Sequence, residues 1–147
     1  MQFDHIGVVV KTLRHGRAML GPALQITEWT REWEDPVNKV FVQFGYDRSG
    51  VCYELIAPLG EGSPVALALK TKSRLLNHVA YLVEDLAAEG ERMRESRCFP
   101  IAEPSPAIAY GGRNIQFFMS PANIIIELIE AAGHKHEILP AEEPATA

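Results

Sequence analysis

The chain has 147 residues, which suits one domain with a sizeable hydrophobic core. Hydrophobic residues make up 47% and charged residues 22%, the composition of an ordinary globular protein. The net charge of −5 argues against a nucleic-acid binder, because phosphate contacts need a basic face. No apolar run reaches the roughly 18–20 residues of a membrane span. With no basic leader and two cysteines expected to be reduced, we expect a cytoplasmic protein.

The predicted elements of the first half begin with a β-branched strand at 2–10 and a short helix at 11–20 that ends at Gly21-Pro22. Three further strands are predicted at 25–33, 38–45 and 51–57. The hinge that follows, 58–75, is expected to hold a short helix near 64–70, with Ser63 as its N-cap.

The second half repeats this order of elements. Its predicted elements are a strand at 75–83, a helix at 85–95, and strands at 98–102, 113–119 and 123–130. Residues 132–147 are rich in Pro, Glu and Ala and predict a flexible C-terminal tail. The order βαβββ, written twice, predicts an α+β fold in one domain, 1–131, with module one at about 1–58 and module two at about 75–131.

Chemistry-bearing residues repeat at the same offset as the elements. Glu54 follows His5 by 49 positions, and Glu127 follows His78 by 49 positions, so both pairs are related by a shift of 73. The surrounding residues repeat too: Asp4-His5-Ile6-Gly7 corresponds to Asn77-His78-Val79-Ala80, and Glu54-Leu55-Ile56 to Glu127-Leu128-Ile129. A long period with two copies indicates a duplicated domain half.

The four repeated residues are predicted to meet at one interior site. Side chains alternate along a strand, so each histidine and glutamate shares its face with apolar neighbours. A buried carboxylate is costly unless it is paired or binds a metal, and two such groups would repel each other. One divalent cation relieves both penalties, and imidazole with carboxylate suits Zn, Ni, Co, Mn or Fe(II). Gly7 and Ala80, on the histidine face, are expected to leave room beside the imidazoles.

These residues resemble the vicinal oxygen chelate superfamily of glyoxalases, bleomycin-resistance proteins and dioxygenases. Residues 54–59, 63–66, 76–80 and 111–117 look most like methylmalonyl-CoA epimerase-like members. The resemblance implies paired βαβββ modules that form a curled mixed sheet around a metal site. It also implies metal ligation by His5, Glu54, His78 and Glu127, and analogy with the superfamily suggests a homodimer.

The resemblance implies an enzyme that transfers a proton α to a carbonyl group, either an isomerase (epimerase) or a carbon–sulfur lyase like glyoxalase I. Glu127 is the expected catalytic residue, and the substrate is expected to be a small carbonyl compound, a thioester or a 2-oxo compound. The epimerase pattern has a second carboxylate where this chain has Lys39. Lys39 and Arg113, which follows two glycines, are the candidate substrate-binding residues.

Two other functions remain open at this point. A non-haem iron dioxygenase uses two histidines and one carboxylate, and Glu54 would crowd such a site. A non-catalytic small-molecule binder of the bleomycin-resistance type would typically lack the metal set. His134 and His136 lie in the predicted tail, where a solvated pair is the simplest expectation.

Overall fold

The computed structural model describes residues 1–141, and within them ten strands form one open, curled sheet. Module one comprises β1 (Gln2–Val9), α1 (Leu13–Leu24), β2 (Glu28–Trp29), β3 (Trp33–Asp35), β4 (Val40–Tyr46) and β5 (Cys52–Pro58). After the linker helix α2 (Ala66–Thr71), module two comprises β6 (Leu76–Leu82), α3 (Leu86–Glu95), β7 (Phe99–Pro100), β8 (Ser105–Ala107), the 3₁₀-helix η1 (Ile108–Tyr110), β9 (Arg113–Met119) and β10 (Ile125–Ile129).

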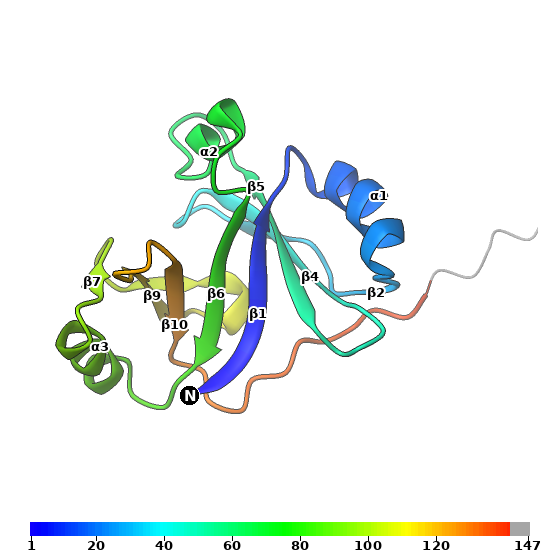
Figure 1. Cartoon of the computed structure of the whole chain (residues 1–147). Helices are drawn as coiled ribbons and strands as arrows, with labels where there is room; N and C mark the ends of the chain where they lie inside the picture. The colour runs from blue at the N-terminus through cyan, green and yellow to red at the C-terminus, as the bar shows by residue number, and fades with distance from the viewer. Residues whose placement is uncertain (142–147) are drawn as a thin grey trace, which may run out of the picture.

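The two modules have the same topology and meet along β1 and β6 (Figure 1). The strand order is β2-β4-β5-β1-β6-β10-β9-β7, with β3 paired to β4 and β8 paired to β9. β1 runs parallel to β5, β6 runs parallel to β10, and β1 and β6 are antiparallel at the centre. The α+β class and the doubled βαβββ arrangement predicted from the sequence are confirmed.

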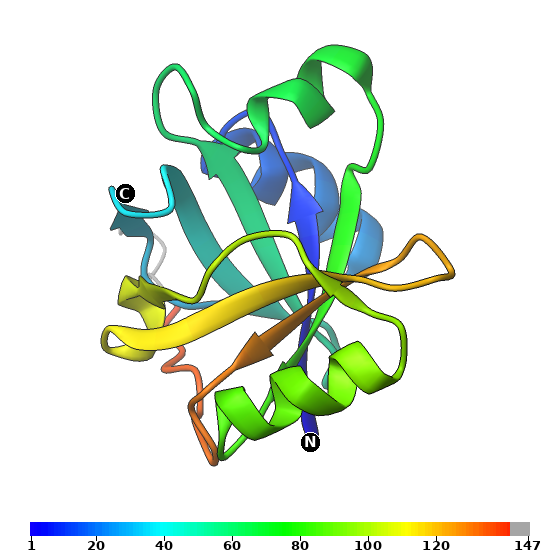
Figure 2. The same ribbon diagram turned by 90° about the vertical axis from the view of Figure 1, so that its left-hand side faces the viewer.

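Alternation along the strands separates an inner face from an outer face. Leu55 and Leu128 are fully buried on the outer face, where they pack in the clusters under α1 and α3. The inner face holds the largest core cluster, which draws on both modules. Figure 2 shows β9 and β10 of module two crossing in front of the strands of module one, so the two halves of the curled sheet face each other. Side chains at the centre of the inner face are therefore enclosed by both modules.

Some local predictions were wrong. The first helix does not end at Gly21-Pro22 but continues to Leu24, because proline keeps a helical φ and the chain reverses only at Gln25, with φ 57°. The strand predicted at 25–33 is divided into β2 and β3, which pair separately with β4. Helix α2 has Val65 rather than Ser63 as its N-cap. Strand β8 and helix η1 were not predicted.

The chain after β10 packs against module one instead of extending freely. Figure 1 shows this segment (orange to red) running from β10 toward β2. The amide of Leu139 donates to the carbonyl of Trp29 over 2.9 Å, and Ile138 forms a β-bridge with Thr30. The prediction of a flexible tail does not hold for 132–141, because these backbone groups find partners in module one. The rest of that predicted tail, 142–147, lies outside the described residues.

Cys52 and Cys98 are both free and buried, and they belong to different core clusters. None of the helices in residues 1–141 has the length and apolar character that a membrane crossing requires.

Candidate metal centre

Four neighbouring central strands contribute one functional side chain each. His5 lies on β1, Glu54 on β5, His78 on β6 and Glu127 on β10. In the sheet, Gly7 lies between Glu54 and His78, and Ala80 lies between Glu127 and His5. Each small residue thus separates a glutamate of its own module from a histidine of the other. The strand register therefore brings the four repeated side chains to one place.

The four donor atoms form a compact cluster. The His5 Nε2 atom is 3.1 Å from His78 Nε2 and 3.4 Å from Glu54 Oε1. The His78 Nε2 atom is 3.5 Å from Glu54 Oε1 and 3.3 Å from Glu127 Oε2. All four donors lie within 4.8 Å of one another, and no residue of the four is more than 7% exposed. The structure therefore brings these four residues together, as the sequence led us to expect.

This donor set fits a small divalent cation. Imidazole nitrogen and carboxylate oxygen bind zinc at about 2.0–2.2 Å, which places neighbouring tetrahedral donors at about 3.3–3.6 Å. The observed separations of 3.1–3.5 Å are close to that range. Two neutral imidazoles with two carboxylates would also balance the charge of one divalent ion. The site is therefore suited to bind one such ion with little rearrangement.

Without a cation, the cluster balances its charge with protons. Burial favours the neutral form of His5, but the Glu54 and Asp4 carboxylates outweigh it and raise the pKa of His5 to about 10. The pKa of His78 is raised in the same way by Glu127 and Glu54, against the effect of burial. Burial would raise the pKa of Glu54, but the two imidazoles lower it to about 2. A proton on the His5 imidazole thus offsets part of the carboxylate charge.

A hydrogen bond to the preceding residue orients each imidazole. The Nδ1–H group of His5 donates to Asp4 Oδ2 over 2.7 Å, and that of His78 donates to Asn77 Oδ1 over 2.9 Å. Both acceptors fix the tautomer that leaves Nε2 facing the cluster. Such partners of metal-binding histidines hold the ring in place and increase its basicity. The two modules therefore repeat the residue that orients the imidazole as well as the histidine itself.

Asp4 has two further partners from distant parts of the chain. Its Oδ2 atom accepts hydrogen bonds from Tyr110 Oη over 2.7 Å and from His136 Nε2 over 2.9 Å. Although burial alone would raise it, the bonds from His136 and His5 hold the pKa of Asp4 well below its usual range. The expectation that His136 belongs to a solvated pair was wrong, because its side chain is only 3% exposed.

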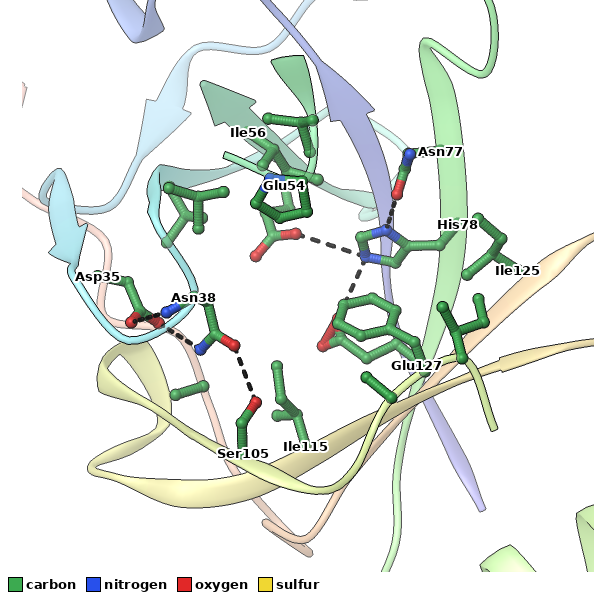
Figure 3. A pocket seen from close by; sticks show the side chains of 18 of the residues that line it. Asp35, Asn38, Glu54, Ile56, Asn77, His78, Ser105, Ile115, Ile125 and Glu127 are labelled. Atoms are coloured by element: carbon green, nitrogen blue, oxygen red, sulfur yellow. Dashed lines mark hydrogen bonds and ion pairs between the residues drawn. The ribbon is translucent and has the colours of Figure 1, made fainter. Parts of the chain in front are cut away.

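A cavity of about 320 Å³ opens on the cluster. Glu54, His78 and Glu127 point into it from one side, as Figure 3 shows. Most of its remaining wall is apolar, formed by residues of both modules that include Val40, Val42, Ile56, Val65, Ile115 and Phe117. Apolar walls exclude water and strengthen electrostatic interactions inside.

A polar group lies on the other side of the cavity (Figure 3). Asn38 Nδ2 donates to Asp35 Oδ2 over 2.9 Å, and Ser105 Oγ donates to Asn38 Oδ1 over 2.8 Å. The other Asp35 oxygen accepts the backbone amides of Val37 and Asn38. This network joins the turn after β3 to β8, so it closes the cavity where the modules face each other.

The structure does not bring the two candidate substrate-binding residues to the cavity. Lys39 is exposed in the turn before β4, with φ 56°, and Arg113 is exposed at the start of β9. Neither contributes to the cavity wall. Lys39 lies in the hairpin turn between β3 and β4, outside the strands whose side chains line the cavity.

Several residues around the cluster were not identified as functional from the sequence. Asp4 and Asn77 carried a usable signal, because each precedes its histidine at the same offset of 73. Tyr110 and His136 carried none, since neither has a matching residue 73 positions earlier, where the chain has Val37 and Ser63. The Asp35–Asn38–Ser105 network depends on contacts between the modules that no local pattern encodes.

The fold and the site together define a class of α+β protein. In this class, a duplicated βαβββ sheet carries two histidines and two glutamates that face an apolar cavity. The family model for the glyoxalase/bleomycin resistance protein/dioxygenase superfamily matches residues 4–118. The chain therefore belongs to this superfamily, and the resemblance to vicinal oxygen chelate proteins is confirmed.

Two curated relatives and one solved structure are similar to the chain over most of its length. An uncharacterized protein of Bacillus subtilis, YqjC, is 30% identical over 140 residues, 92% of this chain and 96% of its own length. The ethylmalonyl-CoA/methylmalonyl-CoA epimerase of Cereibacter sphaeroides is 37% identical over 117 residues, 79% of this chain and 86% of its own. Methylmalonyl-CoA epimerase from Mycobacterium tuberculosis shares the fold, with a TM-score of 0.74 and 23% identity over 89% of this chain and 88% of that one.

Proposed function

We propose that this protein is a metal-dependent enzyme that moves a proton on the carbon next to a substrate carbonyl group, as an epimerase-type isomerase. The observation that carries this proposal is the buried cluster of two histidines and two glutamates at the wall of an apolar cavity. The 37% identity to an acyl-CoA epimerase supports the same reaction class. The site residues and the metal are part of the proposal.

His5, Glu54, His78 and Glu127 would hold one divalent ion, of the Zn, Ni, Co, Mn or Fe(II) kind. When bound, the ion would withdraw electron density from the substrate carbonyl and so acidify the adjacent C–H bond. The protein's own contribution is to hold the substrate against the cluster and to accept the proton.

Glu127 is the proposed catalytic residue. Its side chain is 3% exposed, lies beside the His78 imidazole and faces the cavity. In the proposed step, the substrate C–H bond breaks, its proton passes to a Glu127 carboxylate oxygen, and the electron pair moves toward the carbonyl oxygen. Delivery of a proton to the opposite face of the same carbon completes the epimerisation. The apolar wall keeps water from competing for the carbanion-like carbon.

The cavity wall favours a small carbonyl substrate with an apolar α-substituent. It contains no lysine or arginine, so no protein cation lies in the cavity to neutralise a substrate charge there. A thioester is the first class to test, because the Cereibacter sphaeroides relative is named for ethylmalonyl-CoA and methylmalonyl-CoA. A 2-oxo compound is the second.

A glyoxalase I-like lyase is the second candidate function. The observation that favours it is that, apart from Glu54, the described cavity wall offers no second buried carboxylate that is free of N–H donors. Lys39 lies outside the wall, Asp35 is engaged by three N–H donors, and Glu103 is exposed. Glu54 is then the remaining buried carboxylate that faces the cavity.

The test is exchange of the substrate α-proton in heavy water, followed by mass spectrometry. Methylmalonyl-CoA, ethylmalonyl-CoA and a glutathione hemithioacetal would be incubated with metal-loaded protein and with protein stripped by a chelator. We expect a gain of one deuterium with at least one substrate, only in the loaded sample. No metal-dependent exchange on any of them would contradict the proposal. Tight binding without exchange would favour a bleomycin-resistance type binder, and oxygen consumption with Fe(II) would favour a dioxygenase.

We also propose that the protein acts in the cytoplasm as a homodimer, by analogy with other paired-module proteins. Light scattering during size-exclusion chromatography should give twice the chain mass of 16.3 kDa.

A further inference from the structure

The carboxylate of Asp4 lies behind the metal centre, on the side of His5 away from the cluster. Its Oδ2 atom accepts hydrogen bonds from His5 Nδ1, Tyr110 Oη and His136 Nε2, at 2.7, 2.7 and 2.9 Å. The side chain of Asp4 is 5% exposed. A buried carboxylate with three donors is held in one position, since any rotation would leave its charge unpaired.

An irregularity in β1 lets Asp4 reach the same imidazole that follows it in the chain. The register between β1 and β6 shifts between Phe3 and His5. In a regular strand, consecutive side chains point to opposite faces, so Asp4 would face away from the His5 ring. A local bulge turns one side chain relative to the next and is frequent beside functional sites. The bulge therefore places the carboxylate where it can orient the ring.

His136 is held in place by contacts that its ring and the residues after it make with module one. Its ring stacks on Phe44 with centroids 4.0 Å apart and planes at 22°. Two residues later, Ile138 bridges to Thr30, and Leu139 donates to the carbonyl of Trp29. The segment is thus anchored to module one on the far side of His136, which fixes the direction of its Nε2–H bond to Asp4.

We propose that the segment 132–139 is a positioning element for the metal centre, with His136 as its positioning residue. His136 and Tyr110 fix Asp4, and Asp4 holds the His5 imidazole with Nε2 toward the cluster. The proposal rests on the proposed function only in taking His5, Glu54, His78 and Glu127 as metal ligands. It assigns a role to the C-terminal segment that the doubled modules do not require.

The second histidine provides an internal comparison. His78 is oriented by the neutral amide of Asn77, whose other hydrogen bond is to the carbonyl of Arg74. Asn77 comes from the same strand and receives nothing from the C-terminal segment in residues 1–141. The positioning element therefore acts on one ligand of the pair, and changes in it should alter the His5 side of the centre alone.

The experiment measures metal affinity for the full chain and four variants. Zn²⁺ dissociation constants would be obtained by competition with a chromophoric chelator. His136→Ala removes a donor to Asp4, and we expect about 10–100-fold weaker binding, as for other residues that orient metal ligands. His136→Gln keeps an N–H donor at a similar reach and should recover most of that loss. His134→Ala is the matched control, because it removes an imidazole from the same segment without removing a donor to Asp4.

A second readout separates positioning from folding. The visible spectrum of the Co²⁺ form reports the ligand field, so His136→Ala should shift its bands while His134→Ala leaves them unchanged. Tyr110→Phe removes the other donor and keeps the ring, and it should weaken binding in the same direction even if His136→Ala folds poorly.

The outcomes are distinct for the two proposals. Wild-type affinity and spectrum in both His136→Ala and Tyr110→Phe would overturn the positioning role and leave the proposed function intact. Equal losses in His134→Ala and His136→Gln would also overturn it, because the segment would then matter only for folding. Failure of the wild-type chain to bind Zn²⁺ or Co²⁺ would overturn both proposals.

Discussion

Gly7 occupies a place in the sheet where a side chain cannot fit. A Cβ atom on Gly7 would lie 2.2 Å from Cε1 of His78, far inside van der Waals contact. The His78 imidazole occupies this space, because it lies over β1 where it approaches the other three residues of the cluster. Ala80 occupies the equivalent place beside His5 and is fully buried. Small residues at these two places therefore allow the imidazoles to converge.

Gly7→Ala is expected to displace the His78 ring and to weaken metal binding by at least 10-fold. Overpacking of this kind also destabilises a core by about 1–3 kcal/mol. Isothermal titration with Zn²⁺ and urea unfolding would measure the two effects. Gly21→Ala is the matched control, because its Cβ would be 3.5 Å from the nearest atom. That variant should keep its affinity and gain up to about 1 kcal/mol from higher helix propensity. Unchanged affinity in Gly7→Ala would contradict this account of the site.

Glu127→Gln tests the proposed proton transfer. The amide keeps the shape of the side chain but cannot accept the substrate proton, so we expect α-proton exchange to fall by about 10²–10⁴-fold. Glu103→Gln is the control, since Glu103 lines the cavity but is exposed. Deuterium incorporation would be compared at saturating metal, so that a change in affinity does not mimic a change in rate. Equal rates for both variants would remove Glu127 from the catalytic role.

Metal binding should release protons. In the metal-free protein the pKa of His5 is raised to about 10, by Glu54 and Asp4 against burial, and that of His78 is also raised. The His5 imidazole is therefore protonated at pH 7, and it must become neutral to bind a metal. We expect at least one proton released per ion at pH 7, and an affinity that rises as the pH increases toward 10. Calorimetry in buffers of different protonation enthalpy would count the protons, and a count near zero would contradict the paired charges.

At the scale of elements, regular patterns were predictable and local irregularities were not. The period-2 alternation and the offset of 73 identified β1, β5, β6 and β10 and their inward residues, because those strands are long and regular. The bulge near Phe3 changes the direction of the Asp4 side chain from the one that regular alternation predicts. No sequence pattern predicts this bulge. Strands of two or three residues, such as β2 and β8, form because longer neighbours offer them a free edge. Their pairing depends on tertiary contacts rather than on propensity.

The N-cap of helix α2 differs from the one that the sequence predicted. Ser63 was expected to cap this helix, but Val65 is the N-cap, and the buried Ser63 hydroxyl has no hydrogen-bond partner within residues 1–141. A cap is worth about 1 kcal/mol, whereas an unpaired buried hydroxyl is destabilising. Ser63→Ala should thus be neutral or stabilise by up to about 1 kcal/mol in urea unfolding.

Asp85→Ala is the comparison for Ser63→Ala. Asp85 accepts a hydrogen bond from the amide of Ala88 over 2.9 Å and caps α3. Its removal should cost about 1 kcal/mol. A similar loss in Ser63→Ala would show that Ser63 acts as a cap after all.

At the scale of the whole molecule, the duplication was predictable and the closing segment was not. Two copies of one module imply that they pack against each other at the centre of the molecule. Matched residues on both sides of that contact imply a shared site. Residues 132–141 have no counterpart in the repeat, and their polar, Pro-containing composition is typical of a free tail. Their anchorage comes from His136, Ile138 and Leu139, whose partners Asp4, Thr30 and Trp29 all lie in module one, far away in the sequence.

Because the four proposed ligands come equally from both modules, a bound ion should stabilise the molecule as one cooperative unit. At a free metal concentration 100 times the Kd, binding contributes about 2.7 kcal/mol. For a chain of this size that corresponds to a rise in Tm of about 5–11 °C. Calorimetric scans with Zn²⁺ and after chelation should each show a single transition, separated by that amount. The double variant His5→Gln with Glu54→Gln is the control and should show no shift. Two separate transitions, or the same Tm with and without metal, would mean that the ion does not join the modules.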